Sequence, residues 1–263
     1  MRRFLVVAVL VLAGLAMLAS QRPALRGLDV LRRPTPSQLN LPYDGRFAFV
    51  RVTYETLPGG YWYRGQPAWS HGYPTSEQNL MQILDAVSTL APHLEGTNTL
   101  SLGDPEIFKY PLLYLIEPSW WEMTDAEGVA LRAYLDKGGF VIVDDFKTEE
   151  WMGGRGWAQF ADNMARVDPM AHFVDLDISH PIFHQFFDIT SLEIFPQAYN
   201  AGRPVFRGLF EDNDPTKRLR MFVAYNTDIS QFWEWSSRGF RPVAETNEAY
   251  KLGVNAVLYG ILH

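Results

Sequence analysis

The segment 109–146 constrains the fold more than any other part of the chain. It reads KYPLLYLIEPSWWEMTDAEGVALRAYLDKGGFVIVDDF, in which one apolar run ends at Glu117 and a second ends at Asp144 and Asp145. The pattern between them predicts a helix that begins at a capping box formed by Thr124 and Glu127. A strand, a helix and a second strand in this order form one unit of a parallel sheet, and such sheets bind ligands at their carboxyl edge. The segment therefore predicts an α/β fold with acidic side chains at that edge.

Similar patterns continue on both sides of this unit. Apolar and β-branched runs predict strands over residues 47–54, 97–102, 112–116, 140–143, 205–210 and 221–224, with a further short strand near Phe173. Helical stripes begin at Thr75, where Gln78 completes a capping box, at Trp157, and at Asn247. We therefore predict a doubly wound α/β domain with a mostly parallel sheet over residues 46–263. The region 147–245 is less regular, and there we expect inserted loops or an antiparallel edge.

Composition excludes several classes of function. The net charge of −7 does not match a protein that binds a phosphate backbone, so we predict no nucleic-acid partner. The 263 residues contain no cysteine, which excludes disulfides, thiolate metal sites and a thiol nucleophile. No nucleophilic-serine, P-loop or dinucleotide-binding motif is present, so no cofactor is predicted.

The N-terminus predicts export. Residues 1–20 combine two arginines with an apolar run that is shorter than the about 20 residues needed to span a bilayer, as in a signal peptide or an N-terminal membrane anchor. Residues 21–45 are rich in proline and arginine and are predicted to be a tether. We expect an exported protein, periplasmic or anchored to the membrane and facing the periplasm, although the arginines of the tether oppose export. The sequence leaves cleavage of the leader open.

Acidic and amide side chains follow the predicted strands. Glu117, Asp144 and Asp145 are candidates for a general base, for a metal site or for binding a ligand hydroxyl. Neighbouring carboxylates raise one another's pKa or share a cation, so a divalent metal is compatible with this set. The alternative is structural: one aspartate caps a turn and the other faces solvent. Asn226 and Asp228, which follow the run MFVAY, are further candidates at the same edge.

The loop after the first predicted strand, LPGGYWYRGQPAWSHGYP, is rich in aromatic residues. His71, Tyr61, Trp62 and Trp69 lie in it and are candidate binding residues. Aromatic side chains of this kind bind sugars and peptides by stacking. They are equally typical of a loop that packs on itself over the sheet.

His180 and His184 are four residues apart in DISHPIFHQFF, the spacing that places two imidazoles on one helix face. Together with Asp144 and Asp145 they are weak candidates for metal ligands. Pro181 lies between them, and no glutamate base completes a zinc-protease motif. We therefore favour a structural turn at this position.

Several motifs in order resemble a bacterial family known as domain of unknown function 4159. They are YPLLYLIEP, LRAYLDKGGFVIVDDF, DISHPIF, the polar turn after MFVAYN, and YKLGVNAVLYG. The resemblance covers residues 46–263 and implies a branch of the class I glutamine-amidotransferase-like domains, with a flavodoxin-like sheet. In active relatives a catalytic cysteine follows the strand that matches residues 140–143. Here Asp144 and Asp145 take about that place, so the resemblance implies a scaffold without its nucleophile.

Three functions remain open for a chain of this kind. The first is a non-catalytic, exported or membrane-tethered module that binds an envelope protein, a peptide or a glycan. The second is a structural subunit of an envelope complex. The third is a hydrolase, dependent on carboxylates or a metal, that uses Glu117, Asp144 and Asp145. The absence of cysteine and of a recognisable serine or metal motif favours the first, and an uncleaved leader would add membrane association.

Overall fold

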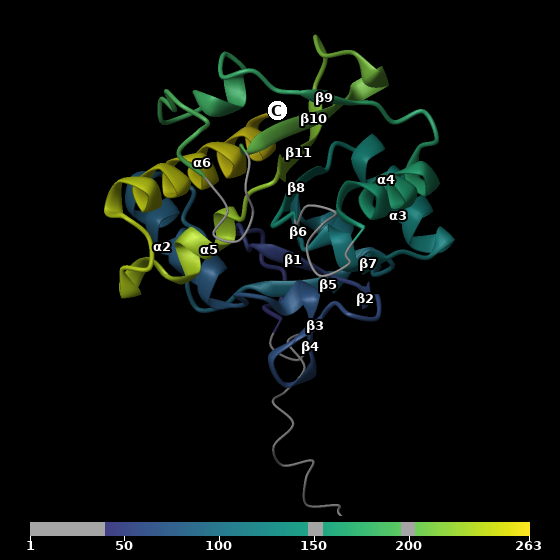
Figure 1. Cartoon of the computed structure of the whole chain (residues 1–263), viewed down its shortest axis with the longest axis horizontal. Coiled ribbons are helices and arrows are strands. Elements are labelled where there is room, and N and C mark those ends of the chain that lie inside the picture. The colour runs from purple at the N-terminus through teal and green to yellow at the C-terminus, as the bar shows by residue number, and fades with distance from the viewer. Residues whose placement is uncertain (1–39, 147–154, 196–202) are drawn as a thin grey trace, which may run out of the picture. The chain divides into compact units, whose positions relative to one another are not determined.

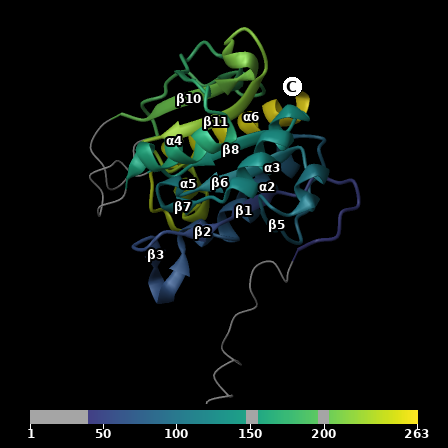
Figure 2. The ribbon, with the colours of Figure 1, turned by 90° about the vertical axis from the view of Figure 1, so that its right-hand side faces the viewer.

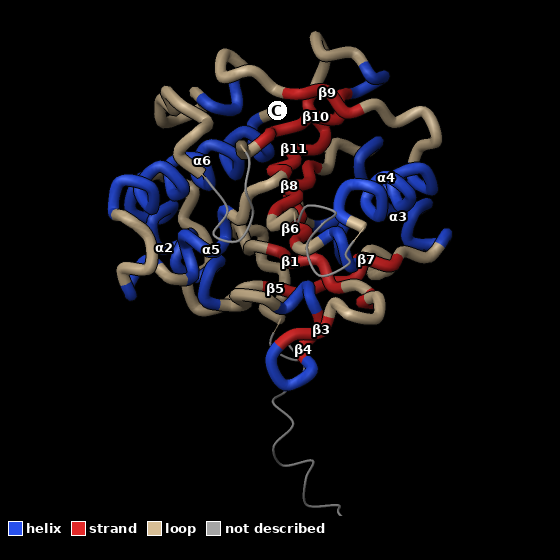
Figure 3. Tube along the Cα trace, viewed as in Figure 1, coloured by secondary structure: helices blue, strands red, loops and turns tan. Residues whose placement is uncertain are grey.

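The computed structural model describes residues 40–146, 155–195 and 203–263, all within one compact unit, Leu39–His263. A seven-stranded sheet forms its centre, with helices on both faces (Figures 1 and 3). The sheet consists of β1 (Val50–Thr53), β5 (Asn98–Ser101), β6 (Leu112–Ile116), β8 (Phe140–Asp144), β9 (Phe173–Asp175), β10 (Val205–Phe210) and β11 (Leu219–Tyr225). The helices of the described residues are α2 (Thr75–Val87), α3 (Asp125–Asp136), α4 (Gly156–Val167), α5 (Ile229–Glu234) and α6 (Val243–Leu262). The prediction of an α/β domain with a mostly parallel sheet is confirmed.

The strand order is β5-β1-β6-β8-β11-β10-β9, and it can be followed in Figure 1. The first five strands are parallel to their neighbours, whereas β10 pairs antiparallel with both β11 and β9. The antiparallel edge expected within 147–245 is therefore present. From β1 the chain goes outward to β5 and then returns to β6 on the other side of β1. The winding direction thus reverses between β1 and β6, which is where open α/β sheets bind ligands.

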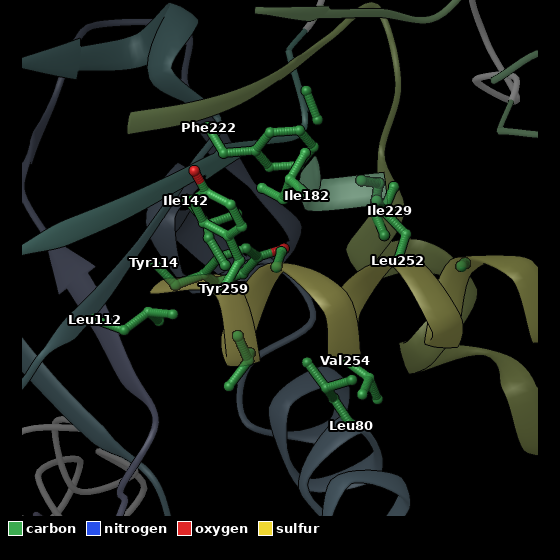
Figure 4. Packing of buried hydrophobic residues seen from close by; sticks show 14 of the residues in the cluster. Leu80, Leu112, Tyr114, Ile142, Ile182, Phe222, Ile229, Leu252, Val254 and Tyr259 are labelled. Carbon is green, nitrogen blue, oxygen red and sulfur yellow. The ribbon is translucent and has the colours of Figure 1, made fainter. Parts of the chain in front are cut away.

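Alternation along the strands fills two cores, one on each face of the sheet. In β6, Leu112 and Tyr114 face the core that α2, α5 and α6 cover, while Leu113 and Leu115 face the core under α3 and α4. Figure 4 shows the first core, where the labelled side chains of the sheet pack against those of α2 and α6, among them Leu80. Both faces of the central strands are buried, which explains why their sequences are continuous apolar runs.

Helix starts were predicted with mixed success. The capping box at Thr124 is present, because this side chain accepts from the Glu127 N–H and Glu127 reaches back to the Thr124 N–H. The box predicted from Thr75 and Gln78 is wrong: α2 has Pro74 at its N-cap position and no side-chain cap. The last helix begins at Val243 rather than at Asn247, because its first turn is largely exposed and carries no apolar stripe to reveal it.

Two short two-stranded sheets flank the central sheet. One joins β2 (Glu55–Thr56) to β7 (Trp121–Glu122), and the other is a hairpin of β3 (Tyr61–Trp62) and β4 (Gln66–Pro67). The hairpin projects beyond the central sheet in Figure 2. Short 3-10 segments complete the described structure: η3 (Tyr63–Gly65), η4 (Ala68–Ser70), η5 (Pro105–Lys109), η6 (Pro118–Trp120), η7 (Pro181–Phe183), η8 (Glu211–Asn213) and η9 (Ser236–Arg238).

The start of the described chain is held along the β5 edge of the sheet. The Asn40 side chain pairs with the backbone N–H and C=O of Thr99, and the Leu41 N–H donates to the Asn98 side chain. Nearby, His93 lies between the carboxylates of Glu95 and Asp44 at 2.7 and 3.0 Å. Burial lowers the pKa of His93, but the hydrogen bonds to these two carboxylates raise it above its usual value.

Candidate functional site

Three neighbouring strands end in the same unusual backbone conformation. Glu117 after β6, Asp145 after β8 and Asn226 after β11 have φ values of 50°, 54° and 55°. A left-handed conformation costs a residue with a side chain about 1–3 kcal/mol and is concentrated at functional sites. The carboxyl edge of the sheet thus carries a row of strained polar residues, all three of which are candidates from the sequence.

The loop after β1 brings His71 to this edge. His71 follows the short 3-10 segment η4, and its own N–H donates to the Ala68 carbonyl. The guanidinium of Arg51, which lies in β1, donates to the carbonyl oxygens of Trp69 and His71 at 3.0 and 2.9 Å. A buried arginine in the sheet therefore fixes the loop that carries the histidine.

His71, Glu117 and Asp145 form one cluster. The distance from His71 Nδ1 is 3.0 Å to Glu117 Oε1 and 3.6 Å to Asp145 Oδ2. One potential metal-ligating atom from each residue lies within 4.8 Å of the other two. The side chains are 30%, 10% and 1% exposed in that order, so the histidine is the member that solvent reaches. The switch point of the sheet thus holds two carboxylates and one imidazole.

A comparison with family models matches residues 48–261 to the family described as domain of unknown function 4159 (DUF4159). The chain belongs to this family. The matched range contains all seven strands of the central sheet and the three residues of the cluster. A search of curated proteins finds no match. Membership in the DUF4159 family therefore identifies the domain but assigns no chemistry to it.

The electrostatics of the DUF4159 cluster keep His71 charged. Burial lowers the pKa of His71, but its contacts with the Asp145 and Glu117 carboxylates outweigh burial and raise the pKa to about 11. Burial and the charges of Glu117 and Asp145 hold the pKa of Tyr54 well above its usual range. The neutral Tyr54 hydroxyl contacts the carbonyl oxygens of Ile116 and Glu117, each at 2.9 Å, and so supports the strained turn after β6.

Asp144 contacts β6 and α5, whereas Asp145 contacts His71. The Asp144 carboxylate accepts hydrogen bonds from the Tyr114 hydroxyl at 2.6 Å and from the N–H groups of Ile229 and Ser230 at 3.1 and 2.9 Å. Burial and the charge of Asp228 raise the pKa of Asp144 to about 7, against the hydrogen bond from Tyr114. Asp144 therefore ties β8 to the start of α5, and it is not a member of the His71 cluster.

Further acidic groups surround the cluster. Asp228 caps α5 by accepting from the Gln231 N–H at 3.0 Å. The Glu234 carboxylate lies against Gly72, where an added Cβ would meet its oxygen at 3.1 Å. Burial raises the pKa of Glu234, while the charge of His71 opposes this effect. Asp228 and Glu234 thus extend the acidic character of the edge beyond the three residues of the cluster.

The aromatic loop residues divide between surface and core. Tyr61 and Trp62 in the β3–β4 hairpin are 52% and 42% exposed, whereas Trp69 is half-buried against the core under α3 and α4. The Trp62 ring lies 4.9 Å from the His71 ring, measured between centroids. Its Nε1–H donates to Ser70 Oγ at 3.3 Å. Trp62 is therefore the aromatic candidate that borders the cluster.

The other histidine candidates lie apart from this cluster. His180 Nδ1 accepts from the Ile182 N–H and so caps η7, as expected for a structural His-Pro turn. His184 pairs with Asp188 and with the Ile178 carbonyl. Among the described residues, the group able to hold a metal contains neither histidine, so the weak metal assignment of His180, His184 and Asp144 finds no support. Because Pro181 lies between the histidines, the helix is confined to η7, and the two imidazoles have different partners.

Asn226 and Asp228 have structural contacts. The Asn226 amide donates to the Arg203 carbonyl at 3.0 Å, and Asp228 is the N-cap of α5. They lie at the predicted edge, but neither belongs to the group of potential metal ligands found among the described residues.

Sequence reasoning missed four residues of the site: Arg51, Tyr54, Glu77 and Glu234. The signal for Arg51 was available, since a single arginine interrupts the apolar run FAFVRVTY and a buried arginine needs a partner. That partner is Glu77 in the first turn of α2. Its position depends on the packing of α2 against β1, which a local pattern does not encode.

The predicted leader, residues 1–20, and most of the predicted tether lie outside the described residues. In the part of the chain that the structure describes, no helix is both long and apolar enough to span a bilayer.

Proposed function

We propose that this DUF4159 domain is a binding module that captures a positively charged ligand at the carboxyl edge of its sheet. One observation carries the proposal: two buried carboxylates from adjacent strands, Glu117 and Asp145, converge on a partly exposed histidine, His71. Two carboxylates that share one charged histidine carry a net charge of −1, and a bound cation offsets this charge.

The charges around the edge favour a cation over an anion. The acidic side chains there are Glu117, Asp144, Asp145, Asp228 and Glu234. His71 supplies one positive charge, and the charge of Arg51 is matched by Glu77 within hydrogen-bond distance. An edge that gathers charges of one sign raises the local concentration of the opposite ion, so phosphates and other anions are disfavoured.

The scaffold we infer is flavodoxin-like and related to the class I glutamine amidotransferases. The order β5-β1-β6-β8-β11 matches the 2-1-3-4-5 order of flavodoxin-like sheets when these five strands are numbered along the chain. Asp145 stands directly after β8 with a φ of 54°, at the sharp turn where that relationship expects a cysteine. With an acid in place of a thiol, acyl transfer through a thioester is not available to this chain.

Two observations bear on the alternative functions. A hydrolase that uses Asp144 is disfavoured because three hydrogen bonds already engage that carboxylate. The exposed Tyr61 and Trp62 favour the second candidate, a subunit of an envelope complex that uses the hairpin as a contact.

We further infer that the N-terminal leader exports the domain to the periplasmic side of the membrane, cleaved or retained as an anchor. The leader's charged start and apolar run support this inference. In that setting the partner class is an envelope protein, a peptide or a glycan that brings a cationic group to Glu117 and Asp145 and an apolar or sugar face to Trp62.

The test is a thermal titration of the full-length protein with spermidine as a cationic probe. A ligand at 100 times its Kd stabilises the folded state by about 2.7 kcal/mol, which raises the Tm of a domain of this size by about 5–11 °C. The double variant Glu117→Gln/Asp145→Asn should lose this rise. The matched control Glu122→Gln/Asp162→Asn, which changes two carboxylates outside the cluster, should keep it.

Sodium chloride at equal ionic strength provides the reference in both titrations. A rise in Tm that is equal in the double variant and the control would show unspecific binding and refute the proposal. If spermidine, divalent metal chlorides and cationic peptides all leave the Tm unchanged, the domain is not a cation-binding module, and the contact function of the hairpin becomes the better account.

A further inference from the structure

The donor atoms of the cluster have the spacing of a metal coordination shell. An ion that holds nitrogen and oxygen donors at about 2.0–2.2 Å separates neighbouring donors by about 2.8–3.6 Å in octahedral or tetrahedral geometry. His71 Nδ1 lies 3.0 Å from Glu117 Oε1 and 3.6 Å from Asp145 Oδ2, and one such atom from each residue lies within 4.8 Å of the others. The two distances from His71 therefore suit a coordination shell, and the third pair of donors lies within 4.8 Å.

We propose that His71, Glu117 and Asp145 bind one divalent first-row transition-metal ion. This inference rests on the proposed function, because it names the cation that the edge captures. A ligating imidazole is neutral, so the ion displaces the proton of His71 to solvent, and it then neutralises the charge of −2 on the two carboxylates. The imidazole nitrogen selects against calcium and magnesium, which prefer oxygen donors, and in favour of ions such as zinc and manganese.

The ligands are held in place by contacts that do not depend on an ion. The Arg51 guanidinium fixes the carbonyl of His71, and the Tyr54 hydroxyl contacts the carbonyl of Glu117. The Glu117 N–H donates to the Asp144 carbonyl at 3.2 Å, which joins the two strand ends. Such support of the ligand backbone is typical of built metal sites, whose outer contacts contribute to metal affinity.

The three protein donors would also leave a coordination position of the ion open. Three protein donors are one fewer than a tetrahedral ion takes, and sites of this kind complete the shell with water or a ligand group. His71 is 30% exposed, so the open side of the ion would face the solvent beside Trp62. An ion held here therefore presents a binding position to a ligand that approaches along the β3–β4 hairpin.

The experiment is a metal titration of the full-length protein after removal of any affinity tag and dialysis against a chelator. We expect one zinc or manganese ion per chain, retained through a second dialysis and counted by elemental analysis. His71→Gln, Glu117→Gln and Asp145→Asn should each weaken binding by more than about 100-fold, since loss of an outer contact alone costs 10–100-fold. The matched controls His184→Gln and Glu122→Gln should bind as the wild type does.

Cobalt provides a second readout that does not require the ligand variants to fold. Because Trp62 lies 4.9 Å from His71 between ring centroids, cobalt in the cluster should quench its fluorescence. Trp62→Phe, a change at an exposed hairpin position, should reduce the quenching while keeping the stoichiometry at one ion per chain. Equal quenching in wild type and Trp62→Phe would place the metal elsewhere and overturn the assignment.

The outcomes separate this inference from the proposed function. Metal binding that depends on the three ligands supports both. Stabilisation by spermidine that requires Glu117 and Asp145, without retained zinc or manganese, refutes the metal site and leaves the cation-binding module standing. If neither probe binds, both proposals are wrong.

Discussion

Replacing Arg51 should destabilise the fold more than any change to a surface charge. The side chains of Arg51 and Glu77 are both 0% exposed and form an ion pair between β1 and α2. Arg51 also donates to the carbonyl oxygens of Trp69 and His71 at 3.0 and 2.9 Å and to Ser76 Oγ at 3.2 Å. One guanidinium thus joins a strand, a helix and the loop that carries the candidate ligand His71.

The loss of folding free energy in Arg51→Met follows from the charge of Glu77, which stays buried after its partner is removed. Two unit charges about 4 Å apart interact with about 4 kcal/mol at the effective dielectric constant of about 20 that suits protein sites. Removal of one partner of a buried pair costs about 3–5 kcal/mol, because the other charge stays buried without compensation. This is a large share of the about 5–15 kcal/mol by which native domains are stable. Glu77→Gln should cost a similar amount, since it leaves Arg51 as the unmatched charge.

The assay is urea unfolding of the full-length protein followed by tryptophan fluorescence. Arg155→Met serves as the matched control, because Arg155 pairs with Asp162 at the surface, where the two side chains are 58% and 61% exposed. Such pairs contribute about 0–1 kcal/mol. The double variant Arg51→Met/Glu77→Gln should cost less than the sum of the single variants, since it removes both charges. Additive costs, or a cost of Arg51→Met below about 1 kcal/mol, would refute the reasoning.

Two further predictions concern packing and pH. Gly260→Ala in α6 places a methyl carbon 2.3 Å from a ring carbon of the buried Phe140, so urea unfolding should show a loss of about 1–3 kcal/mol despite the better helix propensity of alanine. The pKa of His93 is raised in the folded state, so its stabilising contribution is fully present below its unfolded pKa of about 6.5 and is lost as pH rises through the folded value. The stability difference between the wild type and His93→Gln should therefore shrink as the pH rises above about 6.5, and a difference that grows would contradict the assigned contacts.

The sequence predicted those parts of the fold that depend on local pattern. The β6–α3–β8 unit has its own periodicity and its own helix cap, and the adjacency of its strands follows from the connection itself. For that reason the local pattern is sufficient to predict Glu117 and Asp145 at one edge of the sheet. The same pattern does not predict which aspartate contacts α5 and which contacts His71. That choice depends on the residue at which β8 ends and on the turn that follows.

Other features depend on contacts between distant segments. His71 reaches the edge because residues 54–74 fold back over the carboxyl end of β1, and no periodicity encodes that path. The pattern around Arg51 predicts only an apolar strand, since its partner Glu77 lies in a helix whose orientation is determined by packing. The aromatic loop shows the same limit: its composition predicted a binding or a packing surface, and the structure divides it, with Trp62 beside His71 and Trp69 against the core.

The two consecutive aspartates show how the edge supports a strained acid. Asp145 has a left-handed backbone, which costs about 1–3 kcal/mol, and its carboxylate is 1% exposed. The preceding Asp144 accepts three hydrogen bonds, one from Tyr114 in β6 and two from the start of α5. These bonds hold the end of β8 from two sides, so the chain cannot relax the turn at Asp145 without breaking them. Asp144 therefore anchors the end of β8, and this keeps the Asp145 carboxylate at the switch point of the sheet, in contact with His71 and close to Glu117.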